Sequence, residues 1–364
     1  MIKQFKAPLL RGFFLSLVFV INPVFGGDLH TSISNTAWFS VSSNNYSEAI
    51  TILDLYEDDP ESVQDGDLIY SFSQWQIGYQ LNQSIGFGFI RGLDIYAQHS
   101  PDAADIYYSS NAHGQEFENR NYKYNLEGDV QRTQGLFLTY NTQLGDLTIA
   151  SMFEAGQAFG LTSVDINGDL SYENDQLVGT ADIDYFYEKD ALYKREVSEP
   201  EGAYWSVSII LSYPSHLGRH SLSIDDLFNQ THWHETPYTQ VQINTDRVAA
   251  TNDNGSTVFR PLGSGLETYK SKTQVFPKRI NFKNYLIIDE HLEAIAGVNA
   301  IDKDIWPYLG TSILASNLDI SYHIKEKSIS IAQSVNSNFS YRLEADHLAF
   351  EDMHRLSFSL EFCY

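Results

Sequence analysis

The stretch that decides the fold is residues 356–364, which read LSFSLEFCY. Every second position in it carries an apolar or aromatic side chain, at Leu356, Phe358, Leu360, Phe362 and Tyr364. Small or polar residues stand between them. Because successive side chains of a β-strand point to opposite faces, the stretch is predicted to be a strand with one continuous apolar face and one polar face.

The same period of two recurs along most of the chain, in residues 69–78, 85–96, 135–142, 204–213, 318–324, 328–333 and 339–348. The 23 Tyr and 22 Phe residues suit surfaces that are apolar at one end and wet at the other, as membrane interfaces are. After residue 26 no stretch approaches the roughly 18 consecutive apolar residues of a spanning helix. Strands cross lipid only when they close and leave no backbone group unpaired. We therefore predict an all-β fold, an antiparallel up-and-down transmembrane β-barrel.

Polar breaks of two lengths separate the predicted strands. Short turns alternate with longer breaks at residues 57–67, 98–121, 189–202 and 251–271. Spanning barrels place short turns on the periplasmic side and long loops outside, so the long breaks are expected outside the cell. At roughly 20–25 residues for a strand with its connection, residues 27–364 give about 14 strands, within a range of about 12–16.

The amino-terminal residues have the layout of a secretory signal peptide. Three basic residues precede an apolar stretch at residues 13–21, and Gly26 supplies a small-residue cleavage site. We expect removal of residues 1–26, which leaves residues 27–364 as a single exported barrel domain.

Composition argues against two other classes of protein. The formal net charge of −24 would repel nucleic acid, whose phosphates demand Lys and Arg. Cys363 is the single cysteine, so the chain has no disulfide framework to hold a small secreted fold. A soluble β-sandwich or propeller would show similar alternation, and it is the alternative that the pattern leaves open.

The signal peptide together with the terminal strand, with apolar residues at every second position and an aromatic at the end, resembles bacterial outer-membrane β-barrel proteins. Tyr364 stands where Phe is more common, and no narrower family is recognised. The resemblance implies a place in the outer membrane of a Gram-negative bacterium. It also implies contact with outer-membrane lipid, lipopolysaccharide and the machinery that inserts barrels.

No catalytic, cofactor or metal site is predicted. The weak metal candidates are His232, His234 and Glu235, because two imidazoles at i and i+2 share one face of a strand and a carboxylate follows. An Arg that faced lipid at mid-depth would cost about 2–4 kcal/mol. We therefore expect Arg91, Arg132, Arg247, Arg342 and Arg355 to point inward, where they could form a basic ladder in the lumen, or to lie near a membrane interface. The five Trp residues, at positions 38, 75, 205, 233 and 306, are expected at the membrane interfaces.

Architecture favours a function in transport: a porin-like or substrate-selective channel or transporter for small solutes. The alternative is a structural or interaction barrel in surface assembly, filled by its own side chains, since Gly78, Gly86, Gly88 and Gly92 suggest close packing against the wall. The third possibility is a rim hydrolase acting on lipid or peptide, with His99, His113, His216, His220 and His347 as available bases. No G-x-S-x-G motif supports it, so enzymatic activity is not expected. The role of residues 225–238 stays open.

Overall fold

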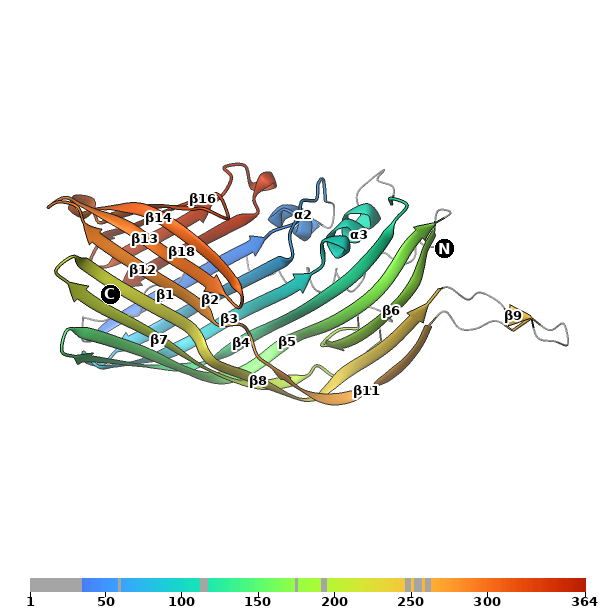
Figure 1. The fold of residues 1–364 in the computed structure, drawn as a ribbon. Helices are drawn as coiled ribbons and strands as arrows, with labels where there is room; N and C mark the ends of the chain where they lie inside the picture. The colour runs from blue at the N-terminus through green and yellow to red at the C-terminus, as the bar shows by residue number, and fades with distance from the viewer. Residues whose placement is uncertain are drawn as a thin grey trace.

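The computed structural model describes residues 35–57, 60–111, 117–173, 176–190, 195–245, 250–251, 257–258 and 263–364 (Figure 1). The predicted signal peptide lies outside these residues. Strands make up 72% of the structure and helices 8%, which confirms the all-β prediction.

The strands of the first half are long, and β5 and β8 run for 27 residues each. The elements up to residue 244 are β1 (Thr36–Ser47), α2 (Ile52–Glu57), β2 (Leu68–Gln80), β3 (Ile85–His99), α3 (Pro101–Asn111), β4 (Asn121–Leu144), β5 (Leu147–Glu173), β6 (Gln176–Tyr187), β7 (Glu201–Ser215) and β8 (Gly218–Asn244). The remaining elements are β9 (Ala250–Thr251), β10 (Thr257–Val258), β11 (Gly263–Gln274), β12 (Arg279–Ile287), β13 (Leu292–Ile301), β14 (Asp304–Ile313), η2 (Leu314–Ser316), β15 (Leu318–His323), β16 (Ser328–Asn336), β17 (Phe339–Ala345), η3 (Phe350–Asp352) and β18 (Arg355–Cys363).

Antiparallel pairing closes the strands into a barrel of 14. The ring runs from β1 to β5, through β7 and β8, and then from β12 to β18, which pairs with β1. β6 is not counted as a separate strand of the ring, because it pairs with the second half of β5 while the first half of β5 pairs with β7. In the same way β8 pairs with β12 and then with β11. The prediction of an up-and-down barrel with about 14 strands is therefore confirmed.

The two ends of the barrel differ. We call the end with the turns at residues 81–84, 145–146 and 216–217 the lower end, where Ala37 N donates to Tyr364 O at 3.0 Å. The connections β1–β2, β3–β4 and β8–β11 leave the opposite, upper end. Figure 1 shows β4, β5, β6 and β11 reaching beyond β13 and β14 at this end, so the wall is higher on one side than on the other.

The outer surface of the wall is apolar. Phe87, Leu138 and Phe153 lie opposite one another on β3, β4 and β5, and each is about half exposed. Leu136, two residues from Leu138 on the same face, is 68% exposed, whereas Phe137 between them is buried. Exposed apolar side chains at every second position are what a lipid-facing barrel wall requires.

β18 continues this surface at the seam of the barrel. Phe358 lies opposite Leu343 of β17, and Phe362 lies opposite Phe39 of β1. Arg355 and Glu361, on the other face of β18, are buried inside. The terminal strand thus joins the last strand of the ring to the first.

We expect replacement of Phe362 and Tyr364 by Ser to leave export intact but to block assembly of the barrel. The reason is that the substitution removes apolar surface from the strand that closes the ring, while the export signal is untouched. Outer-membrane fractionation and heat-modifiable gel mobility measure the result. Ser357→Ala with Ser359→Ala, on the inward face of the same strand, is the control, and normal levels of the Phe362/Tyr364 variant would contradict the expectation.

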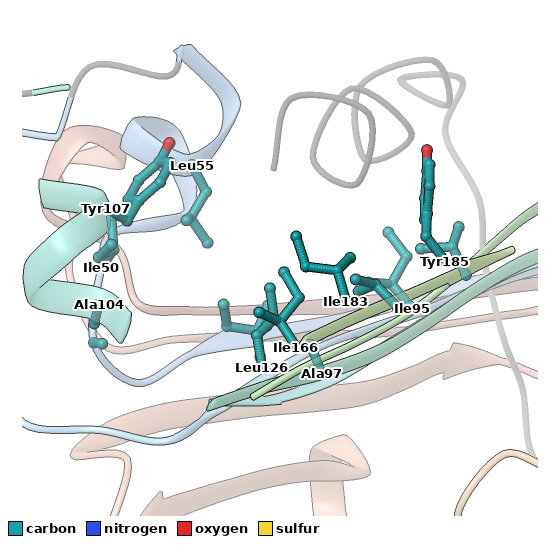
Figure 2. Close-up of a cluster of buried hydrophobic side chains, with 14 of the residues drawn as sticks. Ile50, Leu55, Ile95, Ala97, Ala104, Tyr107, Leu126, Ile166, Ile183 and Tyr185 are labelled. Carbon is teal, nitrogen blue, oxygen red and sulfur yellow. The ribbon is translucent and has the colours of Figure 1, made fainter. Parts of the chain in front are cut away.

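Two short helices cover the outward face of the wall near the upper end. Ile95, Leu126 and Ile166 form a buried apolar cluster there, and Figure 2 shows them facing the side on which Leu55 of α2 and Tyr107 of α3 lie. No helix among the described residues is long and apolar enough to span a membrane.

α3 arises within a segment that was predicted to be a polar break. The hydroxyl of Ser100 accepts a hydrogen bond from Ala103 N at 3.2 Å, and Pro101 follows at the first helical position. Ser as the N-cap and Pro at the next position are signals of a helix start. Arg120 then ties the helix to the wall, with its guanidinium 2.5 Å from Asp102 Oδ1 and from Asp105 Oδ2.

The prediction for the tryptophans is wrong for three of the five. Trp38, Trp233 and Trp306 point inward and are 8%, 0% and 0% exposed, whereas Trp75 and Trp205 lie on the outward face. Glycines of the neighbouring strand make room for two of the inward rings: a Cβ at Gly78 would lie 2.6 Å from Trp38, and one at Gly202 would lie 2.8 Å from Trp233. The expected close packing against the Gly78 region is thereby confirmed.

Candidate functional site

Aromatic side chains cross the lumen near the upper ends of β1, β2 and β14. Tyr46 of β1 and Tyr70 of β2 each place their ring 6.1 Å from the ring of Trp306 on β14. β14 stands across the ring from β2, with β1 and β15–β18 between them on the shorter way round, so these contacts pass through the lumen. We call the buried cluster the aromatic constriction; its members are Tyr46, Leu68, Tyr70, Phe72, Phe276, Ile301 and Trp306.

A polar chamber lies next to the constriction, on its lower side. Along β3, Tyr96 packs against the constriction, Asp94 and Gly92 line the chamber, and Ile90 belongs to a lower apolar cluster with Trp38 and Phe137. The chamber has a cavity volume of about 50 Å³. It is therefore a polar compartment between two apolar layers.

The described residues that line the chamber carry more acidic than basic groups. Asp94, Glu154, Asp225 and Asp226 contribute carboxyl groups, whereas Arg279 contributes the single guanidinium among them. Arg279 Nη2 lies 2.6 Å from Asp226 Oδ2, and its guanidinium stacks 4.5 Å from the ring of Phe72 across the lumen. Because one of the carboxylates is neutralised by Arg279, the others give the chamber a negative balance that favours cations over anions.

Hydrogen bonds fix the walls of the chamber. Gln131 of β4 donates to Asp94 Oδ2 at 3.1 Å and accepts from the hydroxyl of Thr231 on β8 at 2.7 Å. Ser206 of β7 donates to Asp226 Oδ1 at 2.6 Å. These bonds connect four strands, so the acidic side chains are held in place before any solute arrives.

A second buried network lies beside the constriction, around Arg355. Its Nε donates to Glu344 Oε1 at 2.8 Å, and Nη1 donates to Asn44 Oδ1 and to the hydroxyl of Tyr70 at 2.5 Å each. His323 places Nδ1 3.5 Å from the same carboxylate of Glu344. The network therefore anchors Tyr70, a member of the constriction, to β1, β17 and β18.

This network contains the one group of described residues whose donor atoms lie close enough to hold a metal ion: His323, Glu326 and Glu344, all within 4.8 Å of one another. One imidazole and two carboxylates form a donor set that zinc accepts. The guanidinium of Arg355 already supplies a positive charge at Glu344, so the negative charge of this carboxylate is balanced without a metal ion. The sequence reading missed this group, although His323 and Glu326 have the i, i+3 spacing that could have drawn attention to them.

The structure divides the expected basic ladder between the two faces of the wall. Arg355 and Arg342 point inward, and Arg342 Nε donates to Ser330 Oγ at 3.1 Å. Arg91 and Arg132 lie on the outward face instead, in register with Trp75 and Leu93 respectively. This placement follows from the alternation along each strand, because each arginine lies an even number of residues away from the exposed apolar side chains of its own strand and therefore shares their face. Arg247 lies outside the described residues.

His232 and His234 are both exposed on one face of β8, with the buried Trp233 between them. Glu235 is exposed as well and has a positive φ of 48°, which marks an irregular point in the strand. The structure assigns these three residues to the outer surface and not to the chamber.

No family model matches the chain, and no curated protein matches it. Among solved structures it is similar to a TodX deltaS2S3 mutant monoaromatic hydrocarbon channel, with a TM-score of 0.37 and 11% identity over 91% of this chain and 89% of that one. It is also similar to the CymD monoaromatic hydrocarbon channel (0.34, 8%, covering 86% and 74%) and to the siderophore receptor PirA from Pseudomonas aeruginosa (0.24, 9%, covering 92% and 81%).

Proposed function

We propose that the protein is a channel or transporter for small solutes in the outer membrane of a Gram-negative bacterium. The observation that carries the proposal is the acidic chamber inside a closed barrel. A closed barrel whose outer face is apolar has its polar interior as the route across a membrane. The surplus of carboxyl groups suits small polar solutes that are neutral or positively charged.

The aromatic constriction makes this route a gated one. Trp306 is fully buried, and its indole nitrogen makes no hydrogen bond. Rotation of the indole away from Tyr46 and Tyr70 would therefore break ring contacts but no hydrogen bond. Movement of this side chain is the step that we expect to open the lumen.

Asp94→Asn is expected to lower the preference for cations at neutral pH. The substitution removes one chamber carboxyl group without leaving Arg279 unpaired, and a change of about 1 kcal/mol corresponds to roughly a fivefold fall in the cation-to-anion permeability ratio. Reversal potentials of the purified protein in planar bilayers, under a salt gradient, measure the ratio. Glu290→Gln, at a site with a side chain 87% exposed at the lower end, is the matched control; equal ratios in the two variants would count against the chamber as the selective site.

A structural or interaction barrel is the second candidate, favoured by the contacts that fill the lumen between β2 and β14. Planar-bilayer recording separates the two functions. A correctly folded barrel without any conductance, under all voltages and salts tried, would support the structural function over the channel.

The route to the membrane belongs to the same proposal. Residues 1–26 would direct export and be removed, residues 27–364 would form the barrel, and the insertion machinery would bind the terminal strand. Contact with lipid and lipopolysaccharide follows from the apolar outer face. Amino-terminal sequencing of the protein from purified outer membranes tests the cleavage after Gly26.

A further inference from the structure

Three neighbouring strands bring a serine, a histidine and an asparagine together on the outward face at the lower end. Ser215 is the last residue of β7, and His220 lies near the start of β8. The turn at residues 216–217 pairs Ser215 with Gly218, and His220 pairs with Asn284 of β12. Because paired residues and residues two apart share a face, all three side chains lie on one side of the wall.

The three side chains are connected by hydrogen bonds, with the histidine between the serine and the asparagine. His220 Nδ1 lies 2.7 Å from Asn284 Oδ1, and His220 Nε2 lies 3.1 Å from Ser215 Oγ. When Nδ1–H donates to the amide oxygen, Nε2 carries the lone pair that accepts the proton of the serine hydroxyl. A nucleophile, a base and a group that orients the base are the three parts of an acyl-transfer site.

The backbone fixes this geometry. Gly218 has a φ of +147°, and a Cβ there would lie 1.8 Å from Tyr285 O of β12. The turn can therefore pack against β12 only with glycine at this position. Leu217 N also donates to Ser215 Oγ at 3.3 Å, and the hydroxyl can donate to Gly218 O at 3.2 Å as well as to His220, so the serine is held at the mouth of the turn.

Exposed apolar side chains surround the three polar ones. Tyr213, whose ring stacks on His220, is 46% exposed, and Leu217, Phe282 and Leu286, which share that face, are 60%, 42% and 42% exposed. Three polar groups with satisfied hydrogen bonds inside a lipid-facing apolar surface are unusual for a barrel wall. The surroundings suit a hydrocarbon chain, and the adjacent turn lets water reach the serine.

We propose that this site is an esterase that cleaves acyl esters of membrane lipids, with Ser215 and His220 as catalytic residues and Asn284 as a positioning residue. Ser215 Oγ attacks the ester carbonyl carbon while His220 Nε2 takes its proton. The C–O bond of the ester breaks, and His220 returns the proton to the departing alcohol. Water then attacks the acyl-serine, again giving its proton to His220, and the fatty acid leaves as Ser215 Oγ regains a proton. The site is separate from the lumen, so its activity does not depend on solute passage.

The first test uses the full-length barrel folded in mixed micelles of detergent and phosphatidylcholine. The wild type is expected to release fatty acid and to be labelled covalently at Ser215 by a fluorophosphonate probe. Ser215→Ala is expected to abolish both, and His220→Gln to lower kcat by about 10³-fold or more. Ser212→Ala, on the inward face of the same strand, is the matched control, and heat-modifiable mobility establishes that each variant is folded.

The second test addresses Asn284. Asn284→Ala is expected to lower kcat while KM stays near its wild-type value, because the residue orients the base and does not touch the lipid. Asn284→Asp is expected to restore activity and to move the acid limb of the pH profile upward, since a carboxylate favours protonated imidazole. Folded wild-type protein that releases no fatty acid and takes no label, or activity that persists in Ser215→Ala, would overturn the proposal.

Discussion

Replacement of Arg355 by Leu is expected to lower the free energy of unfolding by about 3–5 kcal/mol, because it leaves a buried carboxylate without its partner. The Arg355 side chain is 3% exposed and that of Glu344 2% exposed. Glu344 Oε1 would keep only the hydrogen bond from Ser328, at 2.9 Å. Tyr70 would lose the donor that holds its hydroxyl, so the constriction should loosen as well.

Urea unfolding of the barrel in lipid vesicles, followed by tryptophan fluorescence, measures the effect. Glu290→Leu is the control, because Glu290 is 87% exposed and its partner His291, 3.6 Å away, is 73% exposed; an exposed pair contributes about 0–1 kcal/mol. The double variant Arg355→Leu with Glu344→Leu should recover part of the loss, since it removes the orphaned charge. Equal losses in Arg355→Leu and Glu290→Leu would show that the buried network does not stabilise the barrel.

Trp306→Ala is expected to raise the single-channel conductance several-fold while it lowers the free energy of unfolding by about 3–5 kcal/mol. The indole bridges Tyr46 and Tyr70 across the lumen, and its removal leaves a gap in the constriction. Both effects share one cause, so they should appear together.

Planar-bilayer recording provides the conductance, and the same unfolding assay provides the stability. Trp205→Ala removes the same side chain from the outward face, where Trp205 is 39% exposed, and it should leave the conductance unchanged. A folded Trp306→Ala barrel with wild-type conductance would mean that the constriction does not limit passage, and the structural function would then be favoured.

The two-faced wall of this barrel could be predicted from local patterns in the amino-acid sequence. Alternation with a period of two is a local property, and it separates two sets of side chains in each strand without knowledge of any neighbour. It therefore predicted the strand at residues 356–364 and the all-β barrel, while the length of the chain predicted a count of about 14 strands. The same rule, applied along β3 and β4, places Arg91 and Arg132 with the apolar set and not on the inward face.

The contacts between side chains of different strands could not be predicted in this way, because they depend on how the ring closes. The closure of the ring brings Trp306 against Tyr70 and Arg279 against Phe72, although these residues stand far apart in the sequence and on opposite sides of the lumen. Register within β7, β8 and β12 brings Ser215, His220 and Asn284 together in the same way. Such contacts depend on strand order, stagger and closure, which are properties of the whole ring. The alternation within each strand fixes its two faces, and the closed barrel fixes what each inward or outward side chain touches.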